Sequence, residues 1–178
     1  MVLPKRYLLE RTSDAKDLPI PARRSAQASG LDLHANIKES VTIKKGECVL
    51  IPAGIKIALP FGFEAQIRSR SGLALNHGIV VLNSPGTIDA DYRGEIKILL
   101  MNHGIENFEI SRGDRIAQMV ICKVEMMDCT EVEELPETKR GEDGLGSTGI
   151  KHGNIDLDAF EKFKQEKMKL KDKIGRMD

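Results

Sequence analysis

Short segments in which apolar and polar residues alternate, separated by glycine and proline, dominate the chain from about residue 37 to residue 134. Apolar side chains occupy every second position across 55–59 and again across 96–100. A period of two places the apolar side chains on one face, which is typical of a half-buried β-strand. Turn-forming pairs such as Lys45-Gly46, Pro85-Gly86 and Arg112-Gly113 separate the segments. This arrangement predicts an all-β sandwich or barrel.

The chain has 178 residues, which is enough for one domain and an extension. A short helical turn is expected around Ser71–Asn76. After Pro136 the composition changes to Gly, Ser, Thr and charged residues, which predicts a segment that is mobile until something binds it. Residues 154–175 have the pattern of a charged helix with a narrow apolar stripe. We therefore expect a β core over residues 1–136, a flexible Gly-rich arm over 137–150 and a charged helical extension over 151–178.

Charge and cysteine content exclude several classes of function. Lysine plus arginine and aspartate plus glutamate both number 27, so the net charge is zero and the basic surface typical of duplex-binding proteins is not expected. The sequence contains no apolar run near the roughly 20 residues that a membrane helix needs, and its start does not resemble a secretory signal. Three scattered cysteines without CxxC spacing argue against a disulfide framework or a zinc site, so we expect a cytoplasmic protein.

Four segments carry residues suited to chemistry, and each has a simpler structural interpretation. Arg68–Leu73 combines arginine, serine and glycine at the start of a helical turn and suits an anion; a polar strand end explains it equally well. Asn83–Gly94 suits a β-hairpin that reads a planar ring while a carboxylate polarises water, although an Asx-type turn is the usual explanation. Gln118, in the strand after Arg112-Gly113, needs polar partners. The glycines of Arg140–Gly149 suit phosphate binding, but composition alone favours a linker.

Five segments, taken together and in order, resemble the five motifs of the trimeric dUTPase family. Each segment alone is weak evidence, but five at suitable spacing between about residue 5 and residue 150 are specific. The resemblance therefore outweighs the structural interpretations of the separate segments. The five segments are Ala28–Leu33, Arg70–Ala74, Gly86–Gly94, Gly113–Gln118 and the arm Arg140–Gly149.

The resemblance implies a jelly-roll-like β fold, a homotrimer and three active sites at the interfaces between subunits. Asp89 would hold the attacking water, Asn83 and nearby main-chain groups would read uracil, and Tyr92 would pack against the deoxyribose. Asp32 would lie near the metal through its waters. The substrate-binding residues that the resemblance implies are Arg70, Ser71, Gly72, Asn83, Gly86, Thr87, Ile88, Tyr92, Gln118, Arg140, Leu145, Gly146, Ser147 and Thr148.

The implied reaction is the Mg²⁺-assisted hydrolysis of dUTP to dUMP and pyrophosphate by attack of the Asp89-held water on the α phosphate. This reaction keeps uracil out of DNA and supplies dUMP for dTMP synthesis. The partners are dUTP and further copies of the chain, with neither nucleic acid nor a membrane. Two features depart from the family pattern. Leu145 stands where an aromatic residue usually stacks on uracil, and a charged extension follows an arm that normally ends the chain.

Two alternatives are left. A dCTP deaminase of the same superfamily needs a different acid–base residue, usually glutamate, and the 87–92 segment with the complete Gly-rich arm favours the pyrophosphatase. A regulatory module that binds nucleotide without turnover is disfavoured by the presence of Asp89, Tyr92 and Arg140.

Overall fold

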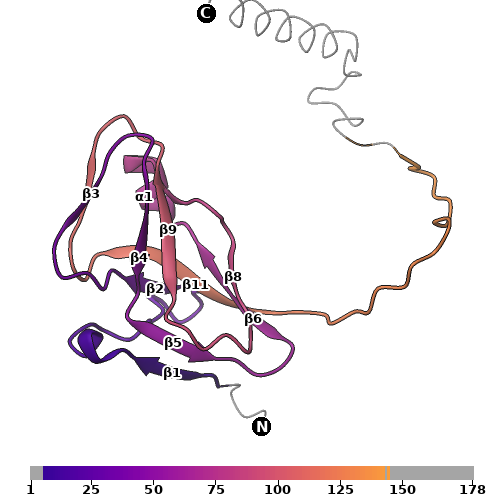
Figure 1. The fold of residues 1–178 in the computed structure, drawn as a ribbon, viewed down its shortest axis with the longest axis horizontal. Helices are drawn as coiled ribbons and strands as arrows, with labels where there is room; N and C mark the ends of the chain where they lie inside the picture. The colour runs from indigo at the N-terminus through magenta and orange to yellow at the C-terminus, as the bar shows by residue number, and fades with distance from the viewer. Residues whose placement is uncertain (1–5, 143, 145–178) are drawn as a thin grey trace, which may run out of the picture. The chain divides into compact units, whose positions relative to one another are not determined.

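The computed structural model describes residues 6–142 and 144, and these residues divide into two units, one that ends at Asp128 and one that begins at Cys129. The regular secondary structure of the first unit is almost entirely β-strand, so the expected all-β fold is confirmed (Figure 1). In chain order its elements are β1 (Leu8–Arg11), the 3-10 helix η1 (Ser13–Ala15), β2 (Leu31–His34), β3 (Val41–Ile43), β4 (Cys48–Pro52), β5 (Ile55–Ala58), β6 (Phe63–Arg68), α1 (Ser71–His77), β7 (Ile79–Val81), β8 (Gly86–Ile88), β9 (Lys97–Asn102), β10 (Phe108–Ile110) and β11 (Arg115–Lys123).

The strands form two main sheets. One has the order β2-β11-β6-β8 and the other the order β4-β9-β7, while β1 pairs with β5 and β10 pairs with β3. All of these pairings are antiparallel. An antiparallel sheet can bury one face and leave the other at the surface, which matches the period of two in the sequence.

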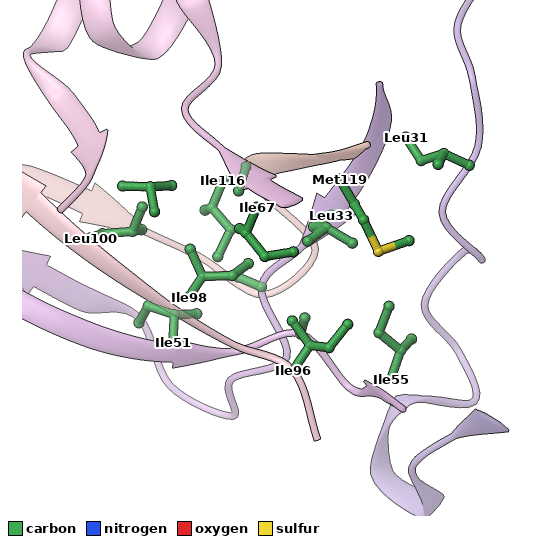
Figure 2. Close-up of a cluster of buried hydrophobic side chains, with 14 of the residues drawn as sticks. Leu31, Leu33, Ile51, Ile55, Ile67, Ile96, Ile98, Leu100, Ile116 and Met119 are labelled. Atoms are coloured by element: carbon green, nitrogen blue, oxygen red, sulfur yellow. The ribbon is translucent and has the colours of Figure 1, made fainter. Parts of the chain in front are cut away.

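The core lies where the buried faces of the sheets meet. Figure 2 shows Ile67 of β6, Ile98 of β9 and Ile116 of β11 among other apolar side chains from strands distant in sequence. The apolar residues at every second position of the two alternating segments are buried, which confirms that pattern. These residues are Ile55, Ile57, Leu59, Ile96, Ile98 and Leu100.

The outer face of the β4-β9-β7 sheet is also apolar. Leu50 lies opposite Leu99 across the β4–β9 pair, and Cys48 and Val80 both lie opposite Met101. Leu50 is 53% exposed. An apolar row on the outside of a sheet is a surface that a partner can cover.

The helical turn expected around Ser71–Asn76 is α1, which begins and ends at Ser71 and His77. The residue that caps its C-terminus is Gly78, whose φ of +68° is left-handed. The backbone of residues 103–104 is so close that a Cβ at Gly78 would lie 2.3 Å from the Gly104 nitrogen. Glycine is therefore required there. The helix expected over 154–175 lies outside the described residues. No helix in the described part of the chain is long and apolar enough to cross a membrane.

The expectation of a β-hairpin within Asn83–Gly94 is wrong, because the one strand in that range, β8, pairs with β6. β7 pairs with β9, whereas β8 pairs with β6, so residues 82–85 connect two different sheets. The physical reason is that β7 pairs with β9, a strand whose central residues Ile98–Met101 are all apolar, and β8 extends the other sheet beyond β6. The residues expected to read a planar ring thus lie on a crossover and on an edge strand.

Candidate active site

One carboxylate, Asp32 on β2, receives three arginines. Arg24 Nε lies 2.9 Å and Arg115 Nη1 lies 3.1 Å from Asp32 Oδ2, while Arg70 Nε lies 3.4 Å from Oδ1. The Asp32 side chain is only 13% exposed. The four residues form the Asp32 cluster, which carries three positive charges against one negative charge.

The Asp32 cluster keeps the carboxylate ionised. Burial raises the pKa of Asp32, but hydrogen bonds from Arg24 and Arg115 and the positive charges of Arg70 and Arg115 lower it further, so the net pKa lies below the ordinary value. Since guanidinium groups do not lose their protons in proteins, the cluster holds a surplus of positive charge at neutral pH. Such a site suits an anion.

Sheet pairing explains why these distant residues meet. β11 lies between β2 and β6, with Gln118 paired to Asp32 on one side and to Arg68 on the other. Gln118 Nε2 donates to the Ser69 carbonyl oxygen at 2.9 Å, which satisfies the polar partner that the sequence required. Arg70 Nη1 donates to the carbonyl oxygen of Arg115 at 2.6 Å. The first, second and fourth predicted motifs are therefore brought together within one chain.

Ser71 and Gly72 form the first turn of α1, directly after Arg70, and both are exposed. A Cβ at Gly72 would meet no atom within 4 Å, so a ligand can approach the main chain there. A hollow of about 300 Å³, lined in part by Arg70 and Arg115, lies beside this turn. Arginine side chains next to open main chain are suited to binding phosphate oxygens.

Asp89 lies elsewhere in the unit. It directly follows β8, is exposed, and lines a hollow of about 460 Å³ together with Phe61, Glu64 and Met126. Thr87 and Ile88 belong to β8 itself. An exposed carboxylate in an open hollow can bind a water molecule.

Tyr92 is near Asp89 in sequence and is fixed by its own turn. Its hydroxyl donates to the Glu95 carbonyl oxygen at 3.1 Å, and its main-chain nitrogen donates to the Asp89 carbonyl oxygen at 3.2 Å. The ring crosses Gly94 so closely that a Cβ there would lie 2.2 Å from the Tyr92 hydroxyl. This arrangement leaves the Tyr92 side chain 43% exposed.

The register of β6 and β8 separates Asp89 from the phosphate-suited residues. Ile67 pairs with Gly86 and Ala65 pairs with Ile88, so Asp89 lies beside the Phe63 end of β6. Since β6 runs from Phe63 to Arg68, Arg70 follows the other end of the strand. The ends of a six-residue strand are about 17 Å apart at roughly 3.3 Å per residue. One chain therefore does not bring Asp89 to Ser71.

Asn83 lies toward the Ser69 end of β6. The Val81 nitrogen donates to Ser69 Oγ at 2.8 Å, and a Cβ at Gly86 would lie 3.2 Å from Asn83 Nδ2.

In the second unit, Arg140 is exposed, and the Gly141 nitrogen donates to the Thr138 carbonyl oxygen at 3.1 Å. Leu145, Gly146, Ser147 and Thr148 lie outside the described residues.

Sequence reasoning missed Arg24. It lies before the first motif, in a stretch without regular structure between η1 and β2, and the sequence carries only a weak signal, the adjacent pair Arg23-Arg24. Arg115 stood within the fourth motif, but its contact with Asp32 was not foreseen. The contact of Arg115 depends on β11 lying beside β2, and the contact of Arg24 depends on the path of an irregular segment.

A metal site made of protein side chains alone is not formed by the described residues, since they contain no group of three or more His, Cys, Asp or Glu side chains that could hold an ion. Asp32 uses both carboxylate oxygens on arginines. It therefore fits the water-mediated contact expected from the sequence better than direct ligation.

Comparison with known proteins agrees with these motifs. The family model described as dUTPase matches residues 16–149. The deoxyuridine 5'-triphosphate nucleotidohydrolase of Thermoanaerobacter sp. (strain X514) is 59% identical over 142 residues, which cover 80% of this chain and 96% of that protein. The dUTPase of Staphylococcus bacteriophage 80alpha, solved with dUPNHPP, is 25% identical with a TM-score of 0.73 and covers 82% of this chain and 99% of its own. A mutant dUTPase from phage phi11 of S. aureus, whose structure shows coordination of a structural Mg(II) ion, is 22% identical with a TM-score of 0.65, over 74% of this chain and 99% of its own.

Proposed function

The chain belongs to the dUTPase family, and we propose that it hydrolyses dUTP to dUMP and pyrophosphate at sites shared between chains. The observation that carries the proposal is the placement of the Asp32 cluster and Ser71 beyond one end of β6 and of Asp89 beside the other. Arginines and open main chain suited to phosphates therefore lie on one part of the unit, and an exposed carboxylate suited to holding a water molecule lies on another. Two copies of the chain can supply the two halves to one substrate.

The phosphate half consists of Arg70, Ser71, Gly72 and Gln118. Arg70 offers a permanently charged donor group, and the open space at Gly72 lets a phosphate reach the main chain. Gln118 donates a hydrogen bond to the Ser69 carbonyl oxygen and so fixes the main chain directly before Arg70 and Ser71. These groups would stabilise the negative charge that builds up on the phosphates during the reaction.

The nucleoside half consists of Asn83, Gly86, Thr87, Ile88 and Tyr92. β8 has β6 as its one partner among the described strands, so its other edge offers main-chain donors and acceptors. Such groups can pair with uracil and leave cytosine with unmade hydrogen bonds, which is an effective means of rejection. Tyr92, fixed across Gly94, would pack against the deoxyribose and exclude a ribose hydroxyl.

Asp89 would act as the general base. Its carboxylate accepts a proton from water, and the water oxygen forms a bond to the α phosphorus. The bond from that phosphorus to the bridging oxygen breaks, and pyrophosphate leaves. When bound, Mg²⁺ would neutralise phosphate charge, held mainly by the substrate with Asp32 in contact through water.

Assembly into a homotrimer is supported by the apolar outer face of the β4-β9-β7 sheet, where Leu50, Leu99 and Met101 lie side by side. Covering this row removes apolar area from water. The Gly-rich arm over 137–150 would close over the site of another chain, with Arg140, Ser147 and Thr148 on the γ phosphate and Leu145 and Gly146 over the base. Along the chain, the β core over 1–136 would be followed by this arm, and the arm by the charged extension over 151–178.

In the cell this activity would keep uracil out of DNA and supply dUMP for dTMP synthesis. A cytoplasmic location stays a prediction of the sequence. The direct test is pyrophosphate release from dUTP, dTTP, dCTP and UTP, with and without Mg²⁺. Release from dUTP alone, dependent on Mg²⁺, is expected, whereas ammonia release from dCTP would identify a deaminase instead.

A further inference from the structure

Arg24 is the member of the Asp32 cluster that no predicted motif contains. It lies between η1 and β2, and its side chain is 66% exposed. Its Nε nevertheless lies 2.9 Å from Asp32 Oδ2, in hydrogen-bonding geometry. An exposed arginine on an irregular segment is therefore tied to a nearly buried carboxylate beside the phosphate-suited residues.

The charges of the Asp32 cluster do not balance. Arg24, Arg70 and Arg115 bring three positive charges to one carboxylate, and Arg24 and Arg115 share the same oxygen, Oδ2. Like charges held this close repel one another, and arginine cannot relieve the repulsion by losing a proton. A second anion beside the cluster would remove the surplus. A polyphosphate provides several negative charges at once.

Arg24 has donor groups left for that anion beyond the one that Asp32 uses. Within residues 6–142 and 144, the hydrogen bond of Arg24 uses Nε, one of the five N–H donors of a guanidinium. Arg70, in contrast, already gives Nη1 to the Arg115 carbonyl oxygen. Arg24 is thus anchored at one edge by Asp32, and its planar terminal fork remains available for bidentate contact with phosphate oxygens.

We propose that Arg24 binds the triphosphate chain of the substrate, with Asp32 as the anchor that aims it. This inference rests on the proposed function, because the polyphosphate is that of dUTP. Asp32 is then a positioning residue, and Arg24 a substrate-binding residue outside the five motifs. The other role open to Arg24 is a surface ion pair that steadies the 19–30 segment, and that role has a different experimental signature.

The test compares Arg24→Gln with Arg23→Gln, which removes the same charge from the neighbouring exposed position. Affinity for dUPNHPP and for dUMP is measured by calorimetry on the full chain. Charge-assisted hydrogen bonds to phosphate predict that Arg24→Gln weakens dUPNHPP binding about tenfold or more while dUMP binding changes less than about twofold. Arg23→Gln should leave both affinities near those of the wild type. The salt dependence of dUPNHPP binding should become shallower in Arg24→Gln.

Three outcomes would overturn the proposal for Arg24. Unchanged dUPNHPP affinity would show that Arg24 makes no phosphate contact. Equal losses for dUPNHPP and dUMP would indicate a structural role, and equal losses in Arg23→Gln would indicate a general charge effect. Turnover of dUTP by the wild-type chain separates these outcomes from failure of the proposed function, since an active wild type with an unaffected Arg24→Gln variant rejects Arg24 alone.

Discussion

Gln118 Nε2 donates a hydrogen bond of 2.9 Å to the Ser69 carbonyl oxygen, which ties the centre of β11 to the residues that lead into α1. Replacing Gln118 with Met keeps the length of the side chain but removes the donor. We expect the free energy of unfolding to fall by about 1 kcal/mol and turnover of dUTP to fall more than tenfold as Arg70 and Ser71 shift. Chemical denaturation and steady-state kinetics measure the two effects. Gln27→Met, at an exposed position, is the control; equal behaviour of the two variants would refute this role of Gln118.

Gly30 and Gly72 should respond oppositely to alanine. A Cβ at Gly30 would lie 2.2 Å from Gln118 Oε1, whereas a Cβ at Gly72 meets nothing within 4 Å. Gly30→Ala should therefore destabilise the fold by about 1 kcal/mol, because the Gln118 amide must turn aside and lose its hydrogen bond to the Ser69 carbonyl oxygen. Gly72→Ala should keep the stability but weaken dUPNHPP binding, because the methyl group occupies the space of a phosphate. Denaturation midpoints and calorimetry check both; a stable Gly30→Ala variant with wild-type turnover would contradict the contact.

Asp89→Asn removes the proposed base without changing the size of the side chain. Loss of a general base typically costs about 10²–10⁴-fold in rate, so kcat for dUTP should fall by that amount. Because Asp89 is exposed, the fold and dUPNHPP affinity should be retained. Asp91→Asn, which changes an exposed carboxylate two residues away, is the matched control and should keep most activity. Near-normal turnover in Asp89→Asn would remove Asp89 from the mechanism.

Stability should decline on the acid side because of ion pairs around Arg112 and in the Asp32 cluster. A hydrogen bond from Arg112 lowers the pKa of Asp17 below its ordinary value of 3.8, and the pKa of Asp32 is lowered as well. A carboxyl with a lowered pKa in the folded state contributes stability above its unfolded pKa and loses that contribution as pH falls through its folded pKa. The denaturation midpoint should therefore drop from about pH 5 downward.

The Asp17→Asn variant isolates one of these groups. Asparagine keeps an oxygen that can accept the hydrogen bond from Arg112, but it carries no charge and does not titrate. The variant should therefore be less stable than the wild type at pH 7. It should also lose less stability than the wild type between about pH 5 and pH 3. Denaturation at a series of pH values measures both slopes. Parallel loss in the two proteins would show that Asp17 does not contribute.

The strand pattern was readable from the sequence because burial on one face leaves a period of two. Ile98 and Leu100 are buried where that period placed them. Pairing partners were less accessible, because they depend on competition between strands. β7 pairs with β9 rather than β8, so the expected hairpin did not form.

The phosphate half of the site was predicted as separate motifs, but its organisation was not. Arg70 and Arg115 stood in motifs that the sequence singled out, yet their common partner Asp32 follows from β11 lying between β2 and β6. Arg24 gave even less signal, since its contact depends on the path of an irregular segment. Local composition does not specify such a path.

The shared site can be tested by mixing two inactive chains. Ser71→Ala damages the phosphate half and Asp89→Asn damages the other half, and both positions are exposed. If each site takes its halves from two neighbouring chains of a cyclic trimer, every trimer that contains both variants has one intact site out of three, and random mixing places about three quarters of the trimers in that group. Co-expression at equal levels should then restore about one quarter of wild-type dUTP turnover. Activity no higher than that of the separate variants would contradict the shared site, because a site within one chain cannot be repaired by mixing.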